Sequence, residues 1–432
     1  MTADHPITTV TIVGASLAGH ASAKALRAQG FIGEITIIGS EPHRPYDRPP
    51  LSKDFLLGTV PQEELILEAD DEDLGARWLL GSAATHLDTA THTVTLSDGR
   101  RISSDAVVIA TGSRARTLGA AASDVSPTGA RVDRIVGLHT LRDIGDSVAL
   151  RAELTLGARL VIVGSGFIGL EVASTAVALG VSTLVLGAGP APLSRLFGET
   201  VAGTLMRLHE RHGVRLRNGV RVSAVLGTHR VTGVQLDTGE IVPADLVLLA
   251  IGADPNVEWL AGTGLADAGG VRCDEVGRTS AARIVAVGDC AAWFDPVRGR
   301  AHRIEHWTDS RDRAAIAVTS LLEQSHPARA TRPSYLWSDQ CGARIQFAGR
   351  LLGDEDIAVE SSGDIETTAD RVESDPVELL VVYRRAGECV AVLGINQPGP
   401  VAKWRKRLTV PAPNSLPTRS RELSILQGVL PE

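Results

Sequence analysis

The chain has 432 residues, a length that predicts two or three domains. A net charge of −8 and a pI of about 5.9 argue against nucleic acid as a partner, and no apolar stretch reaches the roughly 20 residues that cross a bilayer. The start of the chain lacks a signal-peptide pattern, and the four cysteines are far apart without zinc or disulfide-exchange spacing. We therefore expect a cytoplasmic protein with free thiols and no metal site.

The first predicted elements are a buried strand, a glycine-rich turn and a helix, in "TTVTIVGASLAGHASAKALRAQG" (8–30). Gly14, Ser16 and Gly19 occupy the positions of a turn that holds a dinucleotide pyrophosphate at a helix N-terminus. Ser16 replaces the usual middle glycine, and its hydroxyl could donate to a phosphate oxygen. Ser40 and Glu41 follow the next predicted strand, and an acid there can bind the hydroxyls of an adenosine ribose.

A second unit of the same kind follows in "ARLVIVGSGFIGLEVASTAVALG" (158–180), with the full set Gly164, Gly166 and Gly169. One such match could reflect close helix–strand packing alone, but two in one chain indicate two dinucleotide sites. In "STLVLGAGPAP" (182–192) Gly187 takes the place of the acid. An acid there accepts the ribose hydroxyls and repels a 2′-phosphate, so its loss predicts weak discrimination between NADH and NADPH.

Four later stretches add chemistry to the first unit. "RPYDRPPLSKDF" (44–55) is stiffened by prolines and could be a surface loop, or could hold Arg48 and Lys53 at fixed places. "VVIATGSRAR" (107–116) and "RIVAVGDCA" (283–291) are apolar strands, and the second ends at Asp289, which could accept hydrogen bonds from a ribityl chain. "RIEHWTDS" (303–310) places Trp307 near the same helix start.

Together with "IGLEVA" (168–173) and "WSDQ" (337–340), these stretches resemble the FAD- and NAD(P)H-dependent ferredoxin reductases of Rieske oxygenase and bacterial P450 systems, the putidaredoxin reductase and biphenyl dioxygenase reductase type. The resemblance runs from Val10 to about Leu408. It implies an α/β fold with two Rossmann-like dinucleotide-binding domains, as in glutathione reductase, and a small α+β C-terminal domain. The FAD domain would be 1–117 and 247–330, the NAD(P) domain 118–246 and the C-terminal domain 331–432.

Some parts of this organisation have their own local signals. The chain would return from the inserted domain in "ADLVLLAIGADPN" (244–256) and continue through a polar linker at 323–334. Two apolar runs, 378–385 and 388–395, predict a hairpin around Gly387. The proline-punctuated tail, 410–432, would contain one short helix.

The resemblance also implies roles for individual residues. Hydride would pass from nicotinamide C4 to flavin N5. Lys53 would lie beside N5 and pair with Glu171, and Trp307 would lie against the flavin. Glu171 could instead be an exposed helix acid, and Trp307 a core aromatic. The implied FAD-binding positions are Gly14, Ser16, Ala18, Gly19, Ser40, Glu41, Arg48, Lys53, Ala84, Thr111, Gly112, His139, Asp289 and Trp307. The implied NAD(P)-binding positions are Gly164, Gly166, Ile168, Gly169, Glu171, Gly252 and Glu305.

One of these positions departs from the family pattern. The family often has "LRT" where this chain has "LHT" (138–140), so His139 replaces an arginine expected near the FAD phosphates. Histidine is shorter and only sometimes charged, which predicts a weaker hold on FAD.

The cysteines limit where the electrons can go. Residues 42–60 contain no cysteine, which argues against a disulfide reductase and leaves an external acceptor. The resemblance implies NADH as donor, with NADPH possible, FAD as carrier and a small acidic [2Fe–2S] ferredoxin as acceptor. Arginine-rich residues 296–313 and the run 403–407 could steer this partner, or could be solvated surface charge. A quinone or rubredoxin-like acceptor, or a redox-gated flavoprotein without turnover, stays an alternative.

Overall fold

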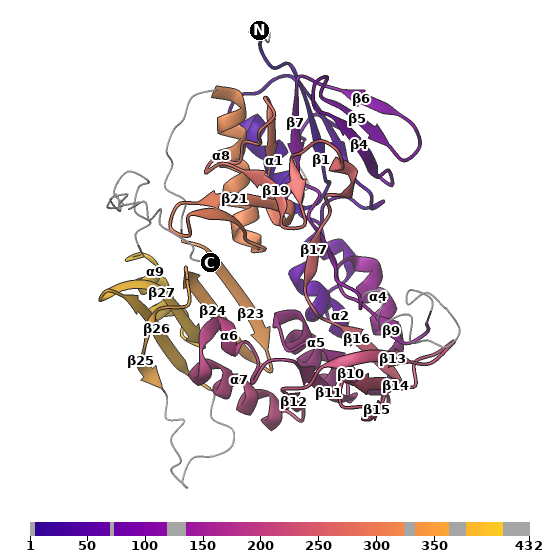
Figure 1. Cartoon of the computed structure of the whole chain (residues 1–432), viewed down its shortest axis with the longest axis vertical. Helices are drawn as coiled ribbons and strands as arrows, with labels where there is room; N and C mark the ends of the chain where they lie inside the picture. The colour runs from indigo at the N-terminus through magenta and orange to yellow at the C-terminus, as the bar shows by residue number, and fades with distance from the viewer. Residues whose placement is uncertain (1–4, 70–72, 119–134, 324–332, 363–376, 409–432) are drawn as a thin grey trace, which may run out of the picture.

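The computed structural model describes residues 5–69, 73–118, 135–323, 333–362 and 377–408. Figure 1 shows three parts: one built on the N-terminal strands at the top, one around α5 at the lower right and the C-terminal sheet at the lower left. The expected short helix of the tail falls at 410–432, outside the described residues, as does most of the predicted linker at 323–334.

The first part is built on a five-stranded parallel sheet. Its central strand, "TVTIV", is a continuous β-branched run because both faces of a parallel sheet are covered. Helix α1 (Leu17–Ala28) packs beside α8 (Trp307–Glu323), two segments far apart in the sequence. The strand order is β20 (Ile284–Ala286), β7 (Ala106–Ile109), β1 (Thr9–Val13), β2 (Glu34–Ile38) and β3 (Ala76–Leu79).

Two smaller sheets flank this core. One is antiparallel and consists of β4 (Ala84–Asp88), β5 (Thr93–Leu96) and β6 (Arg101–Ser103). The other consists of β18 (Ala266–Asp267), β19 (Gly270–Cys273), β21 (Ala291–Asp295) and β22 (Arg300–Arg303). Short helices lie between the strands: η1 (Pro49–Ser52), α2 (Asp54–Leu57) and η2 (Gln62–Leu65) between β2 and β3, η4 (Glu258–Leu260) before β18, and η5 (Gly288–Cys290) before β21.

The second part repeats this architecture around a second parallel sheet. Helix α5 (Phe167–Ala178) follows the glycine-rich turn, and α4 (Ile144–Glu153), α6 (Ser194–Phe197) and α7 (Glu199–Arg211) complete it. The strand order is β12 (Arg215–Asn218), β11 (Ser182–Gly187), β10 (Arg159–Val163), β16 (Leu246–Leu249) and β9 (Leu138–His139), with a separate sheet of β13 (Val222–Leu226), β14 (Gly233–Leu236) and β15 (Ile241–Pro243). This confirms the expected α/β fold with two Rossmann-like units.

A two-stranded ribbon joins the two parts. In it β8 (Ser113–Ala115), which leaves the first sheet, pairs antiparallel with β17 (Ala253–Pro255), which comes back to it. Strand β16 pairs with both β10 and β9, so it is an interior strand of the second sheet. The chain therefore leaves the second part after Leu249, and the expected return at residue 247 lies one strand too early.

In the third part the described residues form an antiparallel sheet and helix α9 (Pro398–Arg405). The predicted hairpin around Gly387 is present as β26 and β27. Strand β23 carries "WSDQ" and lies along α5 of the second part. The strand order is β23 (Tyr335–Gln340), β24 (Ala343–Gly349), β27 (Glu388–Ile395), β26 (Leu379–Arg385) and β25 (Asp356–Ser362).

Candidate active site

Two adjoining cavities open at the carboxyl ends of the first sheet, where parallel α/β sheets bind ligands. Their volumes are about 290 and 580 Å³. They share six lining residues, so they form one elongated site. The shared residues are Ser16, Tyr46, Arg48, Ala110, Gly112 and Arg142.

The first glycine-rich turn forms the wall between the cavities. Gly14 has φ +124°, and an added Cβ there would overlap the carbonyl oxygen of Ala110. Ser16 stands at the N-cap of α1 but makes no capping bond; its hydroxyl accepts from Arg48 at 3.0 Å (Nη2) and 3.2 Å (Nε). A helix N-terminus with a guanidinium beside it fits the pyrophosphate of a dinucleotide.

The larger cavity contains the predicted acid in a fixed position. Glu41 accepts hydrogen bonds from Tyr46 Oη and Arg48 Nη2, each at 2.5 Å. Burial raises the pKa of Glu41, but the charge of Arg48 and these two hydrogen bonds outweigh it and bring the pKa below its ordinary value. The carboxylate is therefore ionised and held in place. Predicted residues that line this cavity are Gly14, Ser16, Ser40, Glu41, Arg48, Ala84, Thr111 and Gly112.

One residue of the larger cavity had no sequence signal. Trp259 lines it and is buried, yet its indole N–H has no partner among the described residues. A buried donor without an acceptor costs about 1–3 kcal/mol unless a bound molecule satisfies it. The orphaned donor and the glycine turn together fit a cavity that holds a nucleotide.

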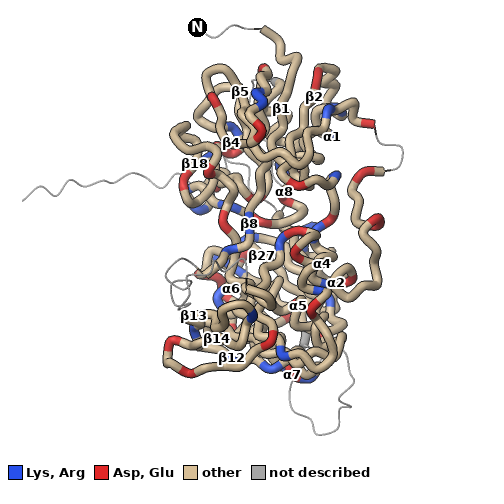
Figure 2. Tube along the Cα trace, turned by 90° about the vertical axis from the view of Figure 1, so that its right-hand side faces the viewer, with Lys and Arg blue, Asp and Glu red and all other residues tan. Residues whose placement is uncertain are grey.

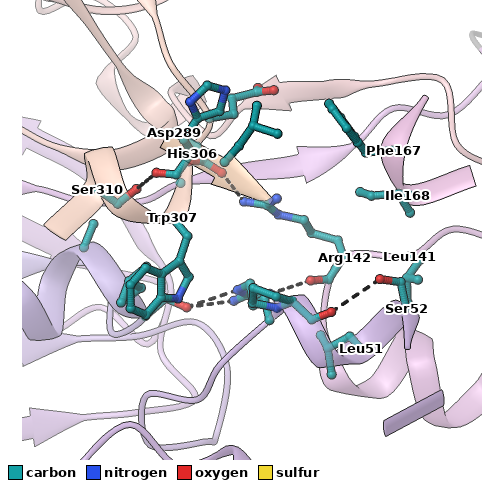
Figure 3. Close-up of a pocket in the computed structure, with 18 of the residues that line it drawn as sticks. Leu51, Ser52, Leu141, Arg142, Phe167, Ile168, Asp289, His306, Trp307 and Ser310 are labelled. Carbon is teal, nitrogen blue, oxygen red and sulfur yellow. Dashed lines mark hydrogen bonds and ion pairs between the residues drawn. The ribbon is translucent and has the colours of Figure 1, made fainter. Parts of the chain in front are cut away.

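Asp289, the predicted ribityl-binding acid, lines the smaller cavity and is bound to an arginine that the sequence did not point to. Arg142 Nη2 donates to Asp289 Oδ2 at 2.5 Å (Figure 3). Arg142 Nε donates to the carbonyl oxygen of Ser113. Arg142 lines both cavities, whereas His139 lines neither. His139 is buried on β9 with its Nε2 3.3 Å from Glu153.

The expected role of His139 at the FAD phosphates is therefore not supported. Burial lowers the pKa of His139, although Glu153 opposes that shift, so it brings no cation to the site. The cation that this stretch brings to the site is Arg142, three residues after His139. Its closeness to "LHT" was the one feature of the sequence that could have indicated it, since no spacing rule distinguishes it from other arginines.

The predicted pair of Lys53 and Glu171 is present in the smaller cavity. Lys53 Nζ lies 2.7 Å from Glu171 Oε2, with the two side chains 13% and 7% exposed. Lys53 also donates to the carbonyl oxygen of Pro49, and Ser52 Oγ donates to Glu171 Oε2 at 2.5 Å. Glu171 is thus not an exposed helix acid; α5 directs it to the η1 loop, and the pair joins the two nucleotide units.

Trp307 forms another wall of the smaller cavity (Figure 3). Its indole N–H donates to Asp47 Oδ1 at 2.7 Å. Its ring packs edge-on against the ring of Trp337, with the two ring centroids 5.8 Å apart. Ile168 and Phe167, from the start of α5, lie on the opposite side of the view. Predicted residues that line this cavity are Ser16, Ala18, Arg48, Lys53, Gly112, Ile168, Glu171, Asp289, Glu305 and Trp307.

Other predicted residues shape the turns without lining either cavity. Gly164 repeats Gly14 with φ +115°, and an added Cβ there would overlap the carbonyl oxygen of Ala250. Gly19 and Gly169 pack against the turn carbonyls of Gly14 and Gly164. The two remaining predicted positions, Gly166 and Gly252, also line neither cavity. An added Cβ on Gly166 would face open space, and Gly252 has φ +102°.

The position of the missing acid is partly filled by neighbours. Gly187 ends β11, and an added Cβ there would lie 2.6 Å from Ser165 Oγ and 3.0 Å from Asn218 Oδ1. Asn218 Oδ1 is itself buried and has no donor among the described residues. Two small neutral groups therefore stand where an acid is usual.

The basic run at 296–313 is not one exposed patch. Arg298 donates to the carbonyl oxygen of Leu351 and lies against Asp295, and the guanidinium of Arg313 lies over the Trp293 ring. Of the five arginines in this run, only Arg300 and Arg311 are exposed. Figure 2 shows basic and acidic positions mixed along the chain rather than gathered on one face in that view.

Metal and disulfide chemistry find no support in the described part of the chain. All four cysteines lie there unpaired, and none lines either cavity. Across 5–408, outside the gaps given above, no group of histidine, cysteine and acidic residues is placed to hold a metal ion. None of the described helices has the length and apolarity to cross a membrane.

Comparison with known families agrees with this geometry. Residues 8–314 match the family model described as pyridine nucleotide-disulphide oxidoreductase. The chain belongs to this family. Within the pyridine nucleotide-disulphide oxidoreductases it is 37% identical over 382 residues to the biphenyl dioxygenase system ferredoxin–NAD(+) reductase component of Paraburkholderia xenovorans (strain LB400), covering 87% of each chain. It is 33% identical to rhodocoxin reductase of Rhodococcus erythropolis, covering 82% of this chain and 81% of the other.

A solved member of the same family has the same fold. The covalent putidaredoxin reductase–putidaredoxin complex matches with a TM-score of 0.83 and 31% identity, covering 94% of each chain. The predicted family and fold class are confirmed. The roles of the individual site residues stay predictions that the geometry above makes specific.

Proposed function

We propose that this chain is an NAD(P)H-dependent reductase that passes electrons through FAD to a small [2Fe–2S] ferredoxin, which feeds an oxygenase of the P450 or Rieske type. The observation that carries the proposal is the buried Lys53–Glu171 pair in a cavity that also contains Asp289 and Trp307. The relative from Paraburkholderia xenovorans, named as a ferredoxin–NAD(+) reductase component, supplies the acceptor class.

The residues present fit FAD along the elongated site. Glu41 would hold the adenosine ribose, the N-terminus of α1 with Arg48 the phosphates, and Asp289 with Arg142 the ribityl chain. FAD supplies the redox chemistry, because it takes up two electrons as a hydride and releases them singly.

The protein's own part is to position and to neutralise charge. Lys53 brings one positive charge to the cavity wall, and Glu171 fixes its direction. Pro49 and Ser52 hold the same pair from the stiff η1 loop, which limits its movement. Phe167 and Ile168 form an apolar entrance from the second unit, suited to a flat nicotinamide ring.

The path of electrons out of the site is also limited by this chain's residues. Since no cysteine lines either cavity, a disulfide acceptor within the chain has no place. Trp307 and Trp337 both line the smaller cavity, Trp337 from β23 of the C-terminal sheet, and the guanidinium of Arg311 lies over the Trp307 ring. We place the docking site of an acidic ferredoxin on this side.

The domain assignment follows from the same proposal. The FAD domain would comprise 1–117 and the segment from β17 to 330, with the NAD(P) domain between them and 331–432 as the C-terminal domain. Free thiols favour the cytoplasm as its compartment.

The test is spectroscopic and kinetic. The purified protein should carry about one FAD per chain, bleach on addition of NADH and reduce a [2Fe–2S] ferredoxin under steady-state turnover. Direct turnover with a quinone at equal or higher kcat/KM would favour the quinone reductase alternative. A colourless protein that FAD does not reconstitute would refute the proposal.

A further inference from the structure

A continuous line of hydrogen bonds leads away from Glu171 into the C-terminal sheet. Ser338 Oγ lies 2.5 Å from Glu171 Oε1, and Gln340 Nε2 lies 2.9 Å from Ser338 Oγ. Gln340 Oε1 lies 2.9 Å from His209 Nε2 on α7, and His209 Nδ1 lies 3.5 Å from Cys341 Sγ. Ser338, Gln340 and His209 are fully buried.

The line has one direction. A carboxylate only accepts, so Ser338 must donate its proton to Glu171 and accept from the amide of Gln340. The carbonyl of Gln340 can only accept, so His209 carries its proton on Nε2 and accepts from the Cys341 thiol on Nδ1. Burial lowers the pKa of His209, which agrees with a neutral ring of this tautomer.

The line cannot serve as a ready proton path, because a carboxamide does not exchange its donor and acceptor atoms easily. Its effect is to fix geometry. Glu171 receives Ser52 and Lys53 on Oε2 and Ser338 on Oε1, so both carboxylate oxygens are occupied from opposite sides. Without Ser338 the described neighbours leave Oε1 without a donor.

A second contact holds the same two elements together. The backbone N–H of Cys341 donates to Ser174 Oγ at 2.7 Å, one turn of α5 beyond Glu171. The end of β23 is thus bound to one face of α5 at two points. Because buried hydrogen bonds hold both carboxylate oxygens of Glu171, its side chain is confined to one rotamer.

From this juxtaposition we propose that Ser338 and Gln340 of the C-terminal sheet are positioning residues for Glu171, and through it for Lys53. The inference rests on the proposed function. It means that the two nucleotide units alone do not complete the site; the third part supplies the donor that orients the ion pair between them. Gln340 acts only through Ser338.

The experiment uses the holoenzyme and four variants: Ser338→Ala, Ser338→Thr, Gln340→Met and the Ser338→Ala/Gln340→Met double variant. The rate of flavin reduction at saturating NADH, measured by stopped flow, should fall about tenfold in Ser338→Ala, while the Kd for NADH changes less than about twofold. Ser338→Thr keeps the hydroxyl and should restore most of the rate. The double variant should be no slower than Ser338→Ala, because both changes break one line.

A matched control separates positioning from general loss of stability. Ser320 on α8 is also buried, and its hydroxyl lies within hydrogen-bond distance of the carbonyl oxygens of Ala317 and Val276. Ser320→Ala removes the same atom far from Glu171 and should lower the Tm to a similar extent without slowing flavin reduction.

A crystal structure of Ser338→Ala gives a readout independent of turnover. We expect Glu171 in a second rotamer, with the Lys53 Nζ contact lengthened beyond hydrogen-bond distance. An unchanged reduction rate with an unchanged Glu171 position would overturn the inference and leave the proposed function standing. If wild type is reduced by neither NADH nor NADPH, the proposed function fails, and the crystal structure still decides the positioning of Glu171.

Discussion

The two glycine-rich turns have nearly the same backbone and very different surroundings. Gly14 and Gly164 share a left-handed conformation and the same close approach to a neighbouring strand. After the first turn, Glu41 is held by Tyr46 and Arg48. At the corresponding place after the second turn, at the end of β11, stands Gly187, which has no side chain that could bind a ribose.

The difference suits two ligands with different residence times. A resident cofactor needs a prearranged anchor, since every hydrogen bond formed in advance reduces the cost of binding. A nicotinamide cofactor must leave after each turnover, so a weaker hold on its adenosine end is tolerated. We therefore expect each backbone turn to decide that a dinucleotide binds, and the neighbouring side chains to decide how tightly.

The largest expected effect comes from breaking each turn separately. Gly14→Ala places a Cβ against the Ala110 carbonyl at a strained φ, so we expect a protein without bound FAD, detected by loss of flavin absorbance. Gly164→Ala should keep FAD and raise the Kd for NADH by roughly a hundredfold or more, as expected for several kcal/mol of strain.

Gly30→Ala is the control for this comparison. Gly30 also has a positive φ of +84° but nothing within 4 Å of an added Cβ, so it tests strain without overlap. FAD should stay bound in this variant. Retention of FAD by Gly14→Ala would show that the first turn is not the FAD anchor.

The next effect concerns the ion pair that joins the two units. Lys53→Met should leave FAD bound and slow flavin reduction by NADH roughly a hundredfold, because a preorganised charge at a reacting centre is worth about 3 kcal/mol. It also leaves Glu171 buried without its cation, so the Tm should fall.

The double variant Lys53→Met/Glu171→Gln separates these two effects. It should recover Tm but not rate, since it removes the unpaired charge without restoring the cation. Lys403→Met, on α9, should change neither quantity. An unchanged stopped-flow rate in Lys53→Met would remove Lys53 from the mechanism.

A smaller effect is expected at the anchor of the first unit. Glu41→Gln removes the charge that Arg48 and Tyr46 hold, and FAD affinity should fall about ten- to a hundredfold, the value of a charge-assisted hydrogen bond of 1.5–3 kcal/mol. Glu240→Gln, in an exposed pair with Arg217, should leave FAD affinity unchanged. Equal affinities of wild type and Glu41→Gln for FAD in titration of the apoprotein would contradict the anchor role.

The smallest effect should come from giving the second unit the missing acid. Gly187→Glu should tighten NADH several-fold and weaken NADPH, although Ser165 and Asn218 must move to admit the new Cβ. Gly189→Glu, where an added Cβ meets only the Ala191 carbonyl at 3.7 Å, should leave both Kd values unchanged. A wild type that already prefers NADH more than about a hundredfold would show that another group, such as Asn218, serves as the anchor.

Local patterns carried much of the prediction. The two turns, the hairpin around Gly387 and the pair of Lys53 and Glu171 follow from motifs whose residues are close together or belong to a known pattern. Arg142 and Trp259 could not be found this way, because Arg142 lies in the loop before α4, Trp259 lies in η4, and neither has a partner at a fixed spacing. His139 has a different reason: its position in the motif did not tell on which side of β9 its ring would lie.

The sequence by itself determined the two dinucleotide turns, the free thiols and the lack of an acid at Gly187, since these depend on residue type and short spacing. The tertiary structure alone decided that Arg142 reaches Asp289 while His139 lies beside Glu153, and that β16 belongs to the second sheet. It also brought Ser338 to Glu171, across 167 positions of the chain. Such contacts depend on how separate elements pack, and no local pattern of side chains records that packing.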